Sequence, residues 1–365
     1  MSVAADHAFM ARALRLAERG LFTTDPNPRV GCVIVRAGTV IGEGWHVQAG
    51  AAHAEVNALT AAGDAARGST AYVTLEPCCH HGRTPPCTEA LIAAGVARVV
   101  IGMNDPNPRV AGNGVQALTA AGIEVTTGVL AAQAGSINPG FIRRMQAGRP
   151  FVRCKLAMSL DGRTAMASGE SRWITGEAAR RDVHRLRARA SAILSGIDTV
   201  LADNPSLNVR LDEETVLQPL RVVLDSRLRL PPAARLLGLP GKTLVLTGSA
   251  DADRTTALVE AGAEVVRLPL DGERLDLIQV MQFLAEREIN ELHIESGPVL
   301  SGALLQSALV DELVLYVAPH LLGDAARGLF TLPGVETMEQ RIELNITDIR
   351  AVGNDWRVTA TVVEG

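Results

Sequence analysis

Aromatic residues are scarce in this sequence, in which Phe, Trp and Tyr make up only 3% of the 365 residues. A chain so poor in aromatics cannot line a long groove with the rings on which single-stranded nucleic acid stacks. Net positive charge is also absent, because the formal charge is −5 at pH 7. No overall field therefore attracts a phosphate backbone, and any phosphate must be held by a few placed cations or amides. We expect no nucleic-acid partner.

Long apolar runs are missing as well. No segment approaches the length that crosses a bilayer, so we expect no membrane partner. The N-terminus carries Asp6 and His7 and lacks the apolar core of a secretory signal, which favours a cytoplasmic location. Met10, Ala13 and Ala17 instead recur at helical spacing, which predicts an amphipathic first helix.

Cysteines are few and odd in number. Five occur, and three of them, Cys78, Cys79 and Cys87, fall within ten residues. In a long chain without a secretory signal, this count indicates a metal site or free thiols rather than a disulfide framework. Cys32 and Cys154 lie in apolar runs, where a cysteine behaves as a small buried hydrophobe.

The length and composition predict two soluble globular domains, since apolar residues make up 47% and charged residues 21% of the chain. Both halves alternate strand-like and helical segments, which is typical of α/β domains. Gly, Pro and paired Arg break the pattern between residues 134 and 150. We therefore place a boundary near residue 147, with domains of residues 1–147 and 148–365.

Individual elements are expected as follows. In the first half, strands are predicted at Gly31–Arg36, Ala71–Thr74 and Arg98–Gly102, and helices at Ala52–Ala62 and Thr88–Ala94. In the second half, helices are predicted at Gly176–Arg189, Leu275–Arg287 and Gly302–Ala308, and strands at Phe151–Met158, Ala192–Leu194, Leu220–Leu224, Thr243–Thr247, Glu264–Arg267, Leu292–Glu295 and Glu312–Val317.

The chemistry of the first half centres on His53, Cys78 and Cys87. One imidazole and two thiolates suit Zn²⁺ and leave a fourth coordination position open for water. Glu55 is two residues from His53, so it can exchange a proton with that water without binding the metal. The pattern His-x-Glu followed by Pro-Cys and a second Cys is the signature of zinc deaminases, with Glu55 as the catalytic proton carrier.

A structural zinc knuckle is the main alternative for this cluster. It needs a fourth ligand, which Cys79, His80 or His81 can supply, but it has no use for Glu55. The sequence also departs from the usual signature, because eight residues rather than two separate Cys78 from Cys87. Cys79 leaves the ligating thiolate ambiguous, and we assign Cys78 because it directly follows Pro77.

Further motifs make the chain resemble the family of bifunctional riboflavin-biosynthesis deaminase/reductases. The long insert between the two cysteines is that family's variant of the deaminase motif, although Cys79 stands where the family often has Ser. The resemblance runs through nearly the whole chain in order, at Pro26–Gly31, Gly42–His46, Pro77–Cys87, Asp105–Pro108, Lys155–Ala165, Ser171–Thr175, Thr199–Pro205 and Glu295–Pro298.

The resemblance implies two consecutive reactions. The first is hydrolytic removal of the 2-amino group of 2,5-diamino-6-(5-phosphoribosylamino)pyrimidin-4(3H)-one, with Zn²⁺, in a cytidine-deaminase-like α/β/α domain. The second is reduction of the ribosyl group to ribityl by NADPH in a dihydrofolate-reductase-like α/β domain. Small phosphoribosylaminopyrimidines are thus the implied partners, and we also expect a homo-oligomer.

The resemblance also implies the residues of each site. For the deaminase substrate these are Asn27, His46, Arg83, Asp105 and Asn107, with Arg83 on the phosphate. For the reductase substrate they are Ser171, Arg187, Leu207, Arg210 and Glu295. For the cofactor they are Ala157, Trp173, Thr199, Asp203, Ser226, Gly297, Pro298, Val299, Leu300, Ser301, Gly302 and Ala303.

Two other functions compete with this interpretation. A nucleic-acid base editor requires an electropositive, aromatic-lined groove, which the composition disfavours. A zinc-stabilised binding module without turnover does not explain Glu55. The second half has no G-x-G-x-x-G fingerprint, and residues alone identify it only as an α/β domain. Its cofactor phosphates are expected where the strand ending at Glu295 turns through Gly297 into a helix.

Overall fold

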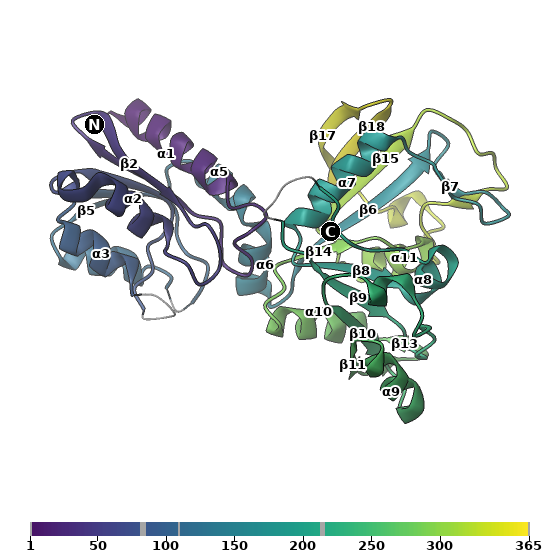
Figure 1. Ribbon diagram of the computed structural model, residues 1–365. Coiled ribbons are helices and arrows are strands. Elements are labelled where there is room, and N and C mark those ends of the chain that lie inside the picture. Colours follow the sequence, from purple (N-terminus) through teal and green to yellow (C-terminus); the bar gives the residue numbers. More distant parts are fainter. Residues whose placement is uncertain (1, 81–84, 109, 212–215, 364–365) are drawn as a thin grey trace. The chain divides into compact units, whose positions relative to one another are not determined.

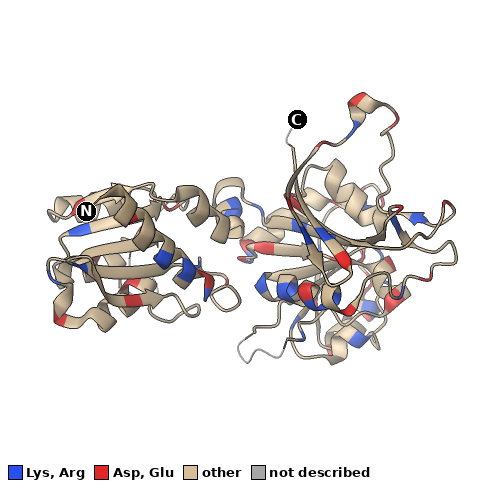
Figure 2. Cartoon of the chain, turned by 90° about the horizontal axis from the view of Figure 1, so that it is seen from above, with Lys and Arg blue, Asp and Glu red and all other residues tan. Residues whose placement is uncertain are grey.

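The computed structural model describes residues 2–80, 85–108, 110–211 and 216–363. It divides into two compact units, Met1–Gly148 and Arg149–Gly365. Each unit is built on its own sheet (Figure 1). No helix in the described ranges has both the length and the apolar character needed to cross a membrane. In the view of Figure 2, acidic and basic residues are interspersed over both units.

The first unit is a three-layer α/β/α domain on a five-stranded sheet. In spatial order the strands are β2 (Thr39–Trp45), β1 (Gly31–Arg36), β3 (Thr70–Leu75), β4 (Arg98–Met103) and β5 (Glu124–Thr127). β1 runs antiparallel to its neighbours, and β3, β4 and β5 are parallel. The helices are α1 (Val3–Glu18), α2 (Ala54–Ala62), α3 (Cys87–Ala94), α4 (Asn113–Ala120), α5 (Ala131–Ile137) and α6 (Pro139–Ala147), with a 3₁₀ turn at Gly63–Ala66.

The core of this unit follows the period-two alternation of its strands. Cys32 and Ile34 of β1 pack on the side of α2 and α3, whereas Val33 and Val35 pack on the side of α1. Because helices cover both faces, the central strands β1, β3 and β4 are almost entirely buried, whereas the edge strands β2 and β5 are only partly buried.

Two glycines of β2 let α2 approach the sheet closely. A Cβ atom on Gly44 would lie 2.5 Å from the carbonyl oxygen of Ala54, and one on Gly42 would lie 2.3 Å from that of Ala58. Those distances are below van der Waals contact, so only glycine allows this spacing. The close packing fixes the first turn of α2 beside the end of β2.

The second unit has a nine-stranded, mostly parallel sheet. Its spatial order is β11 (Ala263–Arg267), β10 (Thr243–Thr247), β9 (Leu220–Leu224), β8 (Ala192–Gly196), β14 (Glu291–Ile294), β6 (Phe151–Ser159), β15 (Glu312–Ala318), β18 (Asp355–Val362) and β17 (Leu344–Val352). Only β15/β18 and β18/β17 pair antiparallel. Two small two-stranded antiparallel sheets pair β12 (Leu270–Asp271) with β13 (Arg274–Leu275), and β7 (Arg163–Ala165) with β16 (Arg327–Gly328).

Helices cover both faces of the large sheet. They are α7 (Glu177–Arg189), α8 (Ile197–Asp203), α9 (Ala252–Glu260), α10 (Leu277–Glu286) and α11 (Pro298–Gln306), with 3₁₀ turns at Arg235–Gly238 and Met338–Gln340. Leu284 of α10 and Leu304 of α11 pack in the largest core cluster, with Leu292 of β14. Val200 of α8 and Leu258 of α9 pack on the opposite face.

The predicted strands at Gly31–Arg36, Leu220–Leu224 and Thr243–Thr247 have those bounds in the structure. The segment that breaks the pattern between residues 134 and 150 forms α5 and α6, because Pro139 occupies a first-turn position that a helix tolerates. One interpretation needs correction. The helix predicted from Gly302 begins at Pro298, with Gly297 as its N-cap.

We predict that Gly44→Ala destabilises the first unit by about 2 kcal/mol and lowers its Tm by roughly 4–8 °C, because the added methyl displaces α2. Differential scanning calorimetry of the full chain measures this shift. Gly135→Ala is the matched control, since its nearest neighbour is a side-chain atom 3.7 Å away. Equal melting temperatures for the two variants would contradict the packing argument.

Candidate functional site

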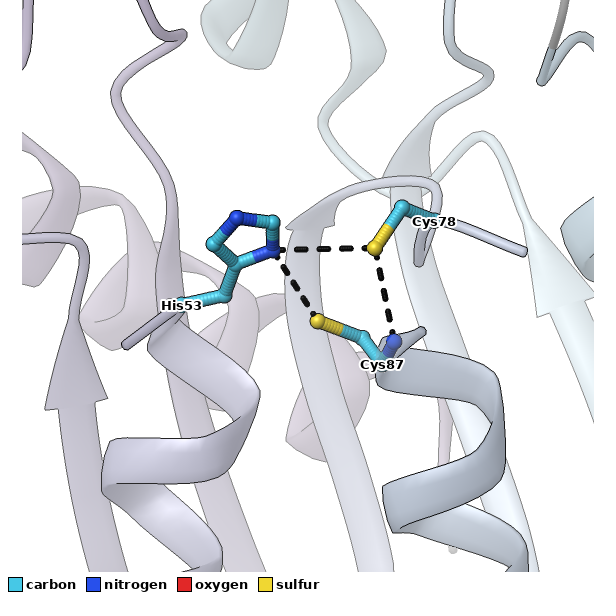
Figure 3. Close-up of side chains that lie close together, drawn as sticks. All are labelled: His53, Cys78 and Cys87. Atoms are coloured by element: carbon cyan, nitrogen blue, oxygen red, sulfur yellow. Dashed lines mark hydrogen bonds between the residues drawn. The ribbon is translucent and has the colours of Figure 1, made fainter. Parts of the chain in front are cut away.

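Three predicted metal ligands lie together in the first unit (Figure 3). His53 is the residue before α2, Cys87 opens α3, and Cys78 follows β3. His53 Nδ1 lies 3.2 Å from Cys87 Sγ and 3.6 Å from Cys78 Sγ. The backbone N–H of Cys87 donates to Cys78 Sγ at 3.3 Å. Chain positions 53, 78 and 87 thus present three donor atoms within 4.8 Å of one another.

The geometry of this cluster fits zinc. Nitrogen and sulfur ligands held about 2.0–2.3 Å from one ion at tetrahedral angles lie roughly 3.3–3.8 Å apart. A hydrogen bond from the Cys87 thiol lowers the pKa of Cys78 to about 4, so one thiolate is already favoured by the protein. No fourth histidine, cysteine or carboxylate among the described residues joins the cluster, and Cys79 is outside it. His81 lies outside the described residues.

Glu55 is buried in the first turn of α2, with 3% of its surface exposed. Burial raises its pKa, and the negative charge of Cys78 adds to that effect. A carboxyl group whose pKa is moved toward neutrality can both take up and release a proton during turnover. The structure therefore provides the proton carrier that a purely structural zinc site does not need.

Asn27 and His46 form a hydrogen-bonded pair beside the cluster. His46 Nδ1 lies 3.1 Å from the carbonyl oxygen of Ala52, and His46 Nε2 lies 3.0 Å from Asn27 Nδ2. Because a carbonyl only accepts, Nδ1 carries the proton and Nε2 accepts from Asn27. Burial lowers the pKa of His46, which keeps the ring neutral. The His46 and His53 ring centroids are 5.3 Å apart, so the pair borders the metal ligands.

Asp105 and Asn107 lie in the segment that follows β4. Asp105 is buried, and its carboxylate accepts the backbone N–H of Asn107 at 2.8 Å. Burial raises the pKa of Asp105 to about 6, with the charges of Glu76 and Cys78 contributing in the same direction. Arg83, predicted to bind the substrate phosphate, falls outside the described residues.

The second unit contains a cleft of about 1680 Å³ at the carboxyl ends of its parallel strands. Pockets for one drug-sized ligand span about 300–1,000 Å³, so this cleft has room for a cofactor and a substrate together. Most of the predicted reductase residues line it, namely Ala157, Ser171, Trp173, Arg187, Thr199, Asp203, Leu207, Arg210, Ser226, Glu295, Gly297, Pro298, Val299, Leu300 and Ala303.

The first turn of α11 faces this cleft, but two predicted cofactor residues do not. Ser301 and Gly302 are buried in the body of the helix. The Ser301 hydroxyl lies 3.0 Å from that of Ser296, and a Cβ on Gly302 would lie 2.0 Å from the carbonyl oxygen of Thr331. Gly302 therefore serves close packing, because the helix starts four residues earlier than predicted.

Arg187 and Glu295 form a bidentate ion pair within the cleft. Arg187 Nη2 lies 2.8 Å from Glu295 Oε2, and Arg187 Nη1 donates to the carbonyl oxygen of Asn208 at 2.8 Å. Burial opposes ionisation of Glu295, but the guanidinium outweighs it and holds the pKa of Glu295 well below its usual value. Because this pair offsets much of the Arg187 charge, Arg210 is the more available cation for a phosphate.

Lys155 also lines the cleft, although it is not among the predicted site residues. Its Nζ lies 5.8 Å from the ring centroid of Tyr316, and burial lowers its pKa while Glu295 opposes that shift. Its position within the apolar strand predicted at Phe151–Met158 could have identified Lys155 as a functional residue, because a lysine inside a buried strand is rarely structural. His184 was also missed; its Nδ1 accepts the Arg210 N–H at 3.1 Å.

The strand end at Asp225–Arg227 borders the same cleft. Ser226 Oγ accepts the N–H of Leu275 at 3.1 Å and retains its own hydroxyl proton for a ligand. Arg227 pairs with Glu273 at 2.8 Å on the surface. Asp225 is fully buried, and its carboxylate accepts the backbone N–H of Leu230 at 2.7 Å. This hydrogen bond holds the carboxylate away from the cleft.

Comparison with known proteins places both units in named families. Residues 150–358 match the RibD C-terminal domain, and residues 3–103 match the zinc-binding region of cytidine and deoxycytidylate deaminases. The chain is 52% identical to riboflavin biosynthesis protein RibD of Escherichia coli, over 96% of this chain and 97% of that protein. The chain belongs to the RibD family.

Solved structures of RibD proteins share the fold over the whole chain. RibD of Acinetobacter baumannii (form 1) is 47% identical with a TM-score of 0.93, covering 100% of both chains. A diaminohydroxyphosphoribosylaminopyrimidine deaminase/5-amino-6-(5-phosphoribosylamino)uracil reductase of Thermotoga maritima is 34% identical, with a TM-score of 0.88 and 99% coverage of each chain.

Family membership confirms the predicted class of function. The chain is a bifunctional deaminase and reductase of riboflavin biosynthesis and acts on small-molecule substrates. The cytidine-deaminase-like and dihydrofolate-reductase-like folds are confirmed, as are Zn²⁺ and NADPH as the cofactors of the two domains. A zinc-stabilised binding module without turnover and a nucleic-acid base editor are therefore not the function of this RibD chain.

We predict that Cys78→Ser reduces bound zinc from near one per chain to below about one tenth and abolishes deamination, because a neutral hydroxyl is a poor zinc ligand. Cys79→Ser is the matched control, since Cys79 lies outside the cluster and should leave zinc and deamination intact. Atomic absorption on both purified variants gives the answer. Zinc lost from the Cys79 variant and kept by the Cys78 variant would reassign the ligand.

Proposed function

We propose that residues 1–147 form the deaminase domain and residues 148–365 the reductase domain. The first removes the 2-amino group of 2,5-diamino-6-(5-phosphoribosylamino)pyrimidin-4(3H)-one to give 5-amino-6-(5-phosphoribosylamino)uracil, and the second reduces the ribosyl group to ribityl. The observation that carries this proposal is a buried Glu55 beside a three-ligand cluster, on the same chain as a cleft large enough for two ligands. The activities named for the Thermotoga maritima protein support the choice of substrates.

Deamination requires one proton carrier and a fixed pyrimidine. His53, Cys78 and Cys87 would hold a zinc ion, which when bound would supply the Lewis acidity that makes water nucleophilic near neutral pH. Glu55 takes a proton as the C–O bond forms and delivers it as the C–N bond breaks and ammonia leaves. Asn27 and His46 hold the pyrimidine edge, and Asp105 and Asn107 bind the ribose, with the phosphate assigned to Arg83.

Reduction requires a proton as well as a hydride. The predicted cofactor residues that line the cleft, at the strand ends and the first turn of α11, would hold NADPH, which would supply the hydride. Lys155 donates the proton that accompanies opening of the ribose ring, because it is a cation with a lowered pKa in the same cleft as Glu295. Ser171, Leu207 and Arg210 hold the ribotide, and Glu295 fixes Arg187 beside it.

Assembly and location complete the proposal. We infer a homo-oligomer, because edge strand β17 has an unpaired side and carries Leu344, Ile346 and Ile349, each at least 42% exposed. A location in the cytoplasm is supported by the five cysteines, all of which are free.

We predict that Glu55→Gln lowers kcat for deamination by at least about a hundredfold with zinc retained, because the amide keeps the shape but cannot carry the proton. Ammonia release measures this loss. The matched control is the second activity of the same variant, since NADPH oxidation with 5-amino-6-(5-phosphoribosylamino)uracil should be unchanged. Normal ammonia release would refute the assignment of Glu55.

We predict that replacing Ser226 and Arg227 together by Ala raises the KM for NADPH by roughly tenfold, equivalent to about 1.4 kcal/mol, while the KM for NADH hardly changes. The reason is that a hydroxyl donor and a cation at this strand end fit the 2′-phosphate, which NADH lacks. Steady-state kinetics with both cofactors separates the cases. Equal losses would mean that this strand end holds the common part of the dinucleotide.

A further inference from the structure

Glu76 is a buried carboxylate to which neither reaction assigns a role. It lies between the end of β3 and Cys78, and only 3% of its surface is exposed. A buried carboxylate is costly unless donors surround it, so its partners indicate what it holds.

The Glu76 side chain accepts three backbone N–H groups, all from the segment after β4. Oε2 accepts from Asp105 at 3.1 Å and from Gly112 at 3.0 Å, and Oε1 accepts from Val115 at 3.2 Å. Its own N–H donates to the carbonyl oxygen of Met103 at 3.0 Å. β3 and β4 are neighbouring parallel strands, so this one residue ties together the segments that leave both strand ends.

Two of the three donors belong to the N-terminus of α4. Gly112 is the N-cap of that helix and Val115 is in its first turn, where backbone N–H groups have no partner within the helix. The negative charge of Glu76 also matches the positive end of the helix dipole. An amide side chain at this position would present one acceptor and one donor, and the donor would face an N–H group.

Close packing shows that α4 is seated directly on the Glu76–Pro77 backbone. A Cβ atom on Gly114 would lie 2.2 Å from the carbonyl oxygen of Pro77 and 3.1 Å from Glu76 Oε1. The helix start, the carboxylate and the peptide leading to Cys78 therefore form one packed unit. Asp105 and Asn107 lie on the segment between β4 and this helix.

We propose that Glu76 is a positioning residue for the deamination reaction, which fixes Asp105 and Asn107 in register with the metal ligands. The proposal rests on the proposed function, in which these two residues bind the ribose of the substrate. Glu76 contacts neither the substrate nor the reacting atoms, and it acts through the segment that it holds by three hydrogen bonds. Its removal should thus weaken substrate binding more than it slows the chemical step.

The test uses Glu76→Gln in the full chain, with Glu18→Gln as the matched control because Glu18 is an exposed glutamate of α1. For Glu76→Gln we expect zinc near one per chain, a KM for the diaminopyrimidine ribotide raised about tenfold or more, and a kcat within about threefold, since charge-assisted bonds are lost outside the reacting centre. Loss of zinc or an unchanged KM overturns the proposal.

A double-mutant cycle with Asn107→Ala separates positioning from a general loss of stability. Asn107→Ala should raise the KM about tenfold in the native background but less than about twofold in the Glu76→Gln background, because the released segment no longer presents Asn107. If the two substitutions raise the KM independently, so that their fold-changes multiply, the proposal is overturned.

Glu76→Asp, which keeps the charge and shortens the side chain, serves as the second variant if Glu76→Gln does not fold. Failure of the unsubstituted chain and of Glu18→Gln to deaminate would instead refute the proposed function.

Discussion

Parallel strand pairing leaves the carboxyl ends of neighbouring strands side by side at one edge of a sheet. In the first unit, β2, β3 and β4 all end at the same edge, because β1 runs antiparallel between β2 and β3. His46 follows β2, Cys78 follows β3 and Asp105 follows β4. Residues separated by up to about sixty positions in the sequence therefore meet at one place without any long connecting loop.

The second unit applies the same constraint to a larger sheet. The cleft is bordered by residues that follow β8, β9 and β14, including Thr199, Ser226 and Glu295. These strands are buried and most of their side chains are apolar, although Arg221 of β9 and Glu291 and His293 of β14 are buried polar exceptions. Burial at that edge strengthens the Arg187–Glu295 pair and shifts the pKa of Lys155, because water no longer screens the charges.

Sequence reasoning was strongest where a chemical spacing was local. The metal cluster and Glu55 follow from two short motifs, and the buried strands follow from uninterrupted apolar runs. It failed where tertiary contacts decide the outcome. The ion pair between Arg187 and Glu295 joins residues more than one hundred positions apart, and nothing near Arg187 indicates that its charge is already matched.

A local signal also misled at one point. The glycine at 302 suggested a helix start, although it is required for close packing against Thr331. Where a helix begins relative to such a glycine depends on contacts that a single sequence does not contain.

The central claim is that one chain carries out deamination and then reduction. The most direct measurement offers 2,5-diamino-6-(5-phosphoribosylamino)pyrimidin-4(3H)-one to the full chain, with and without NADPH, and identifies all products by mass spectrometry. We expect ammonia and the uracil ribotide without NADPH, and the ribityl compound with one NADPH oxidised for each ammonia released when NADPH is present. Absence of ammonia release, or oxidation of NADPH before any ammonia appears, would contradict the account.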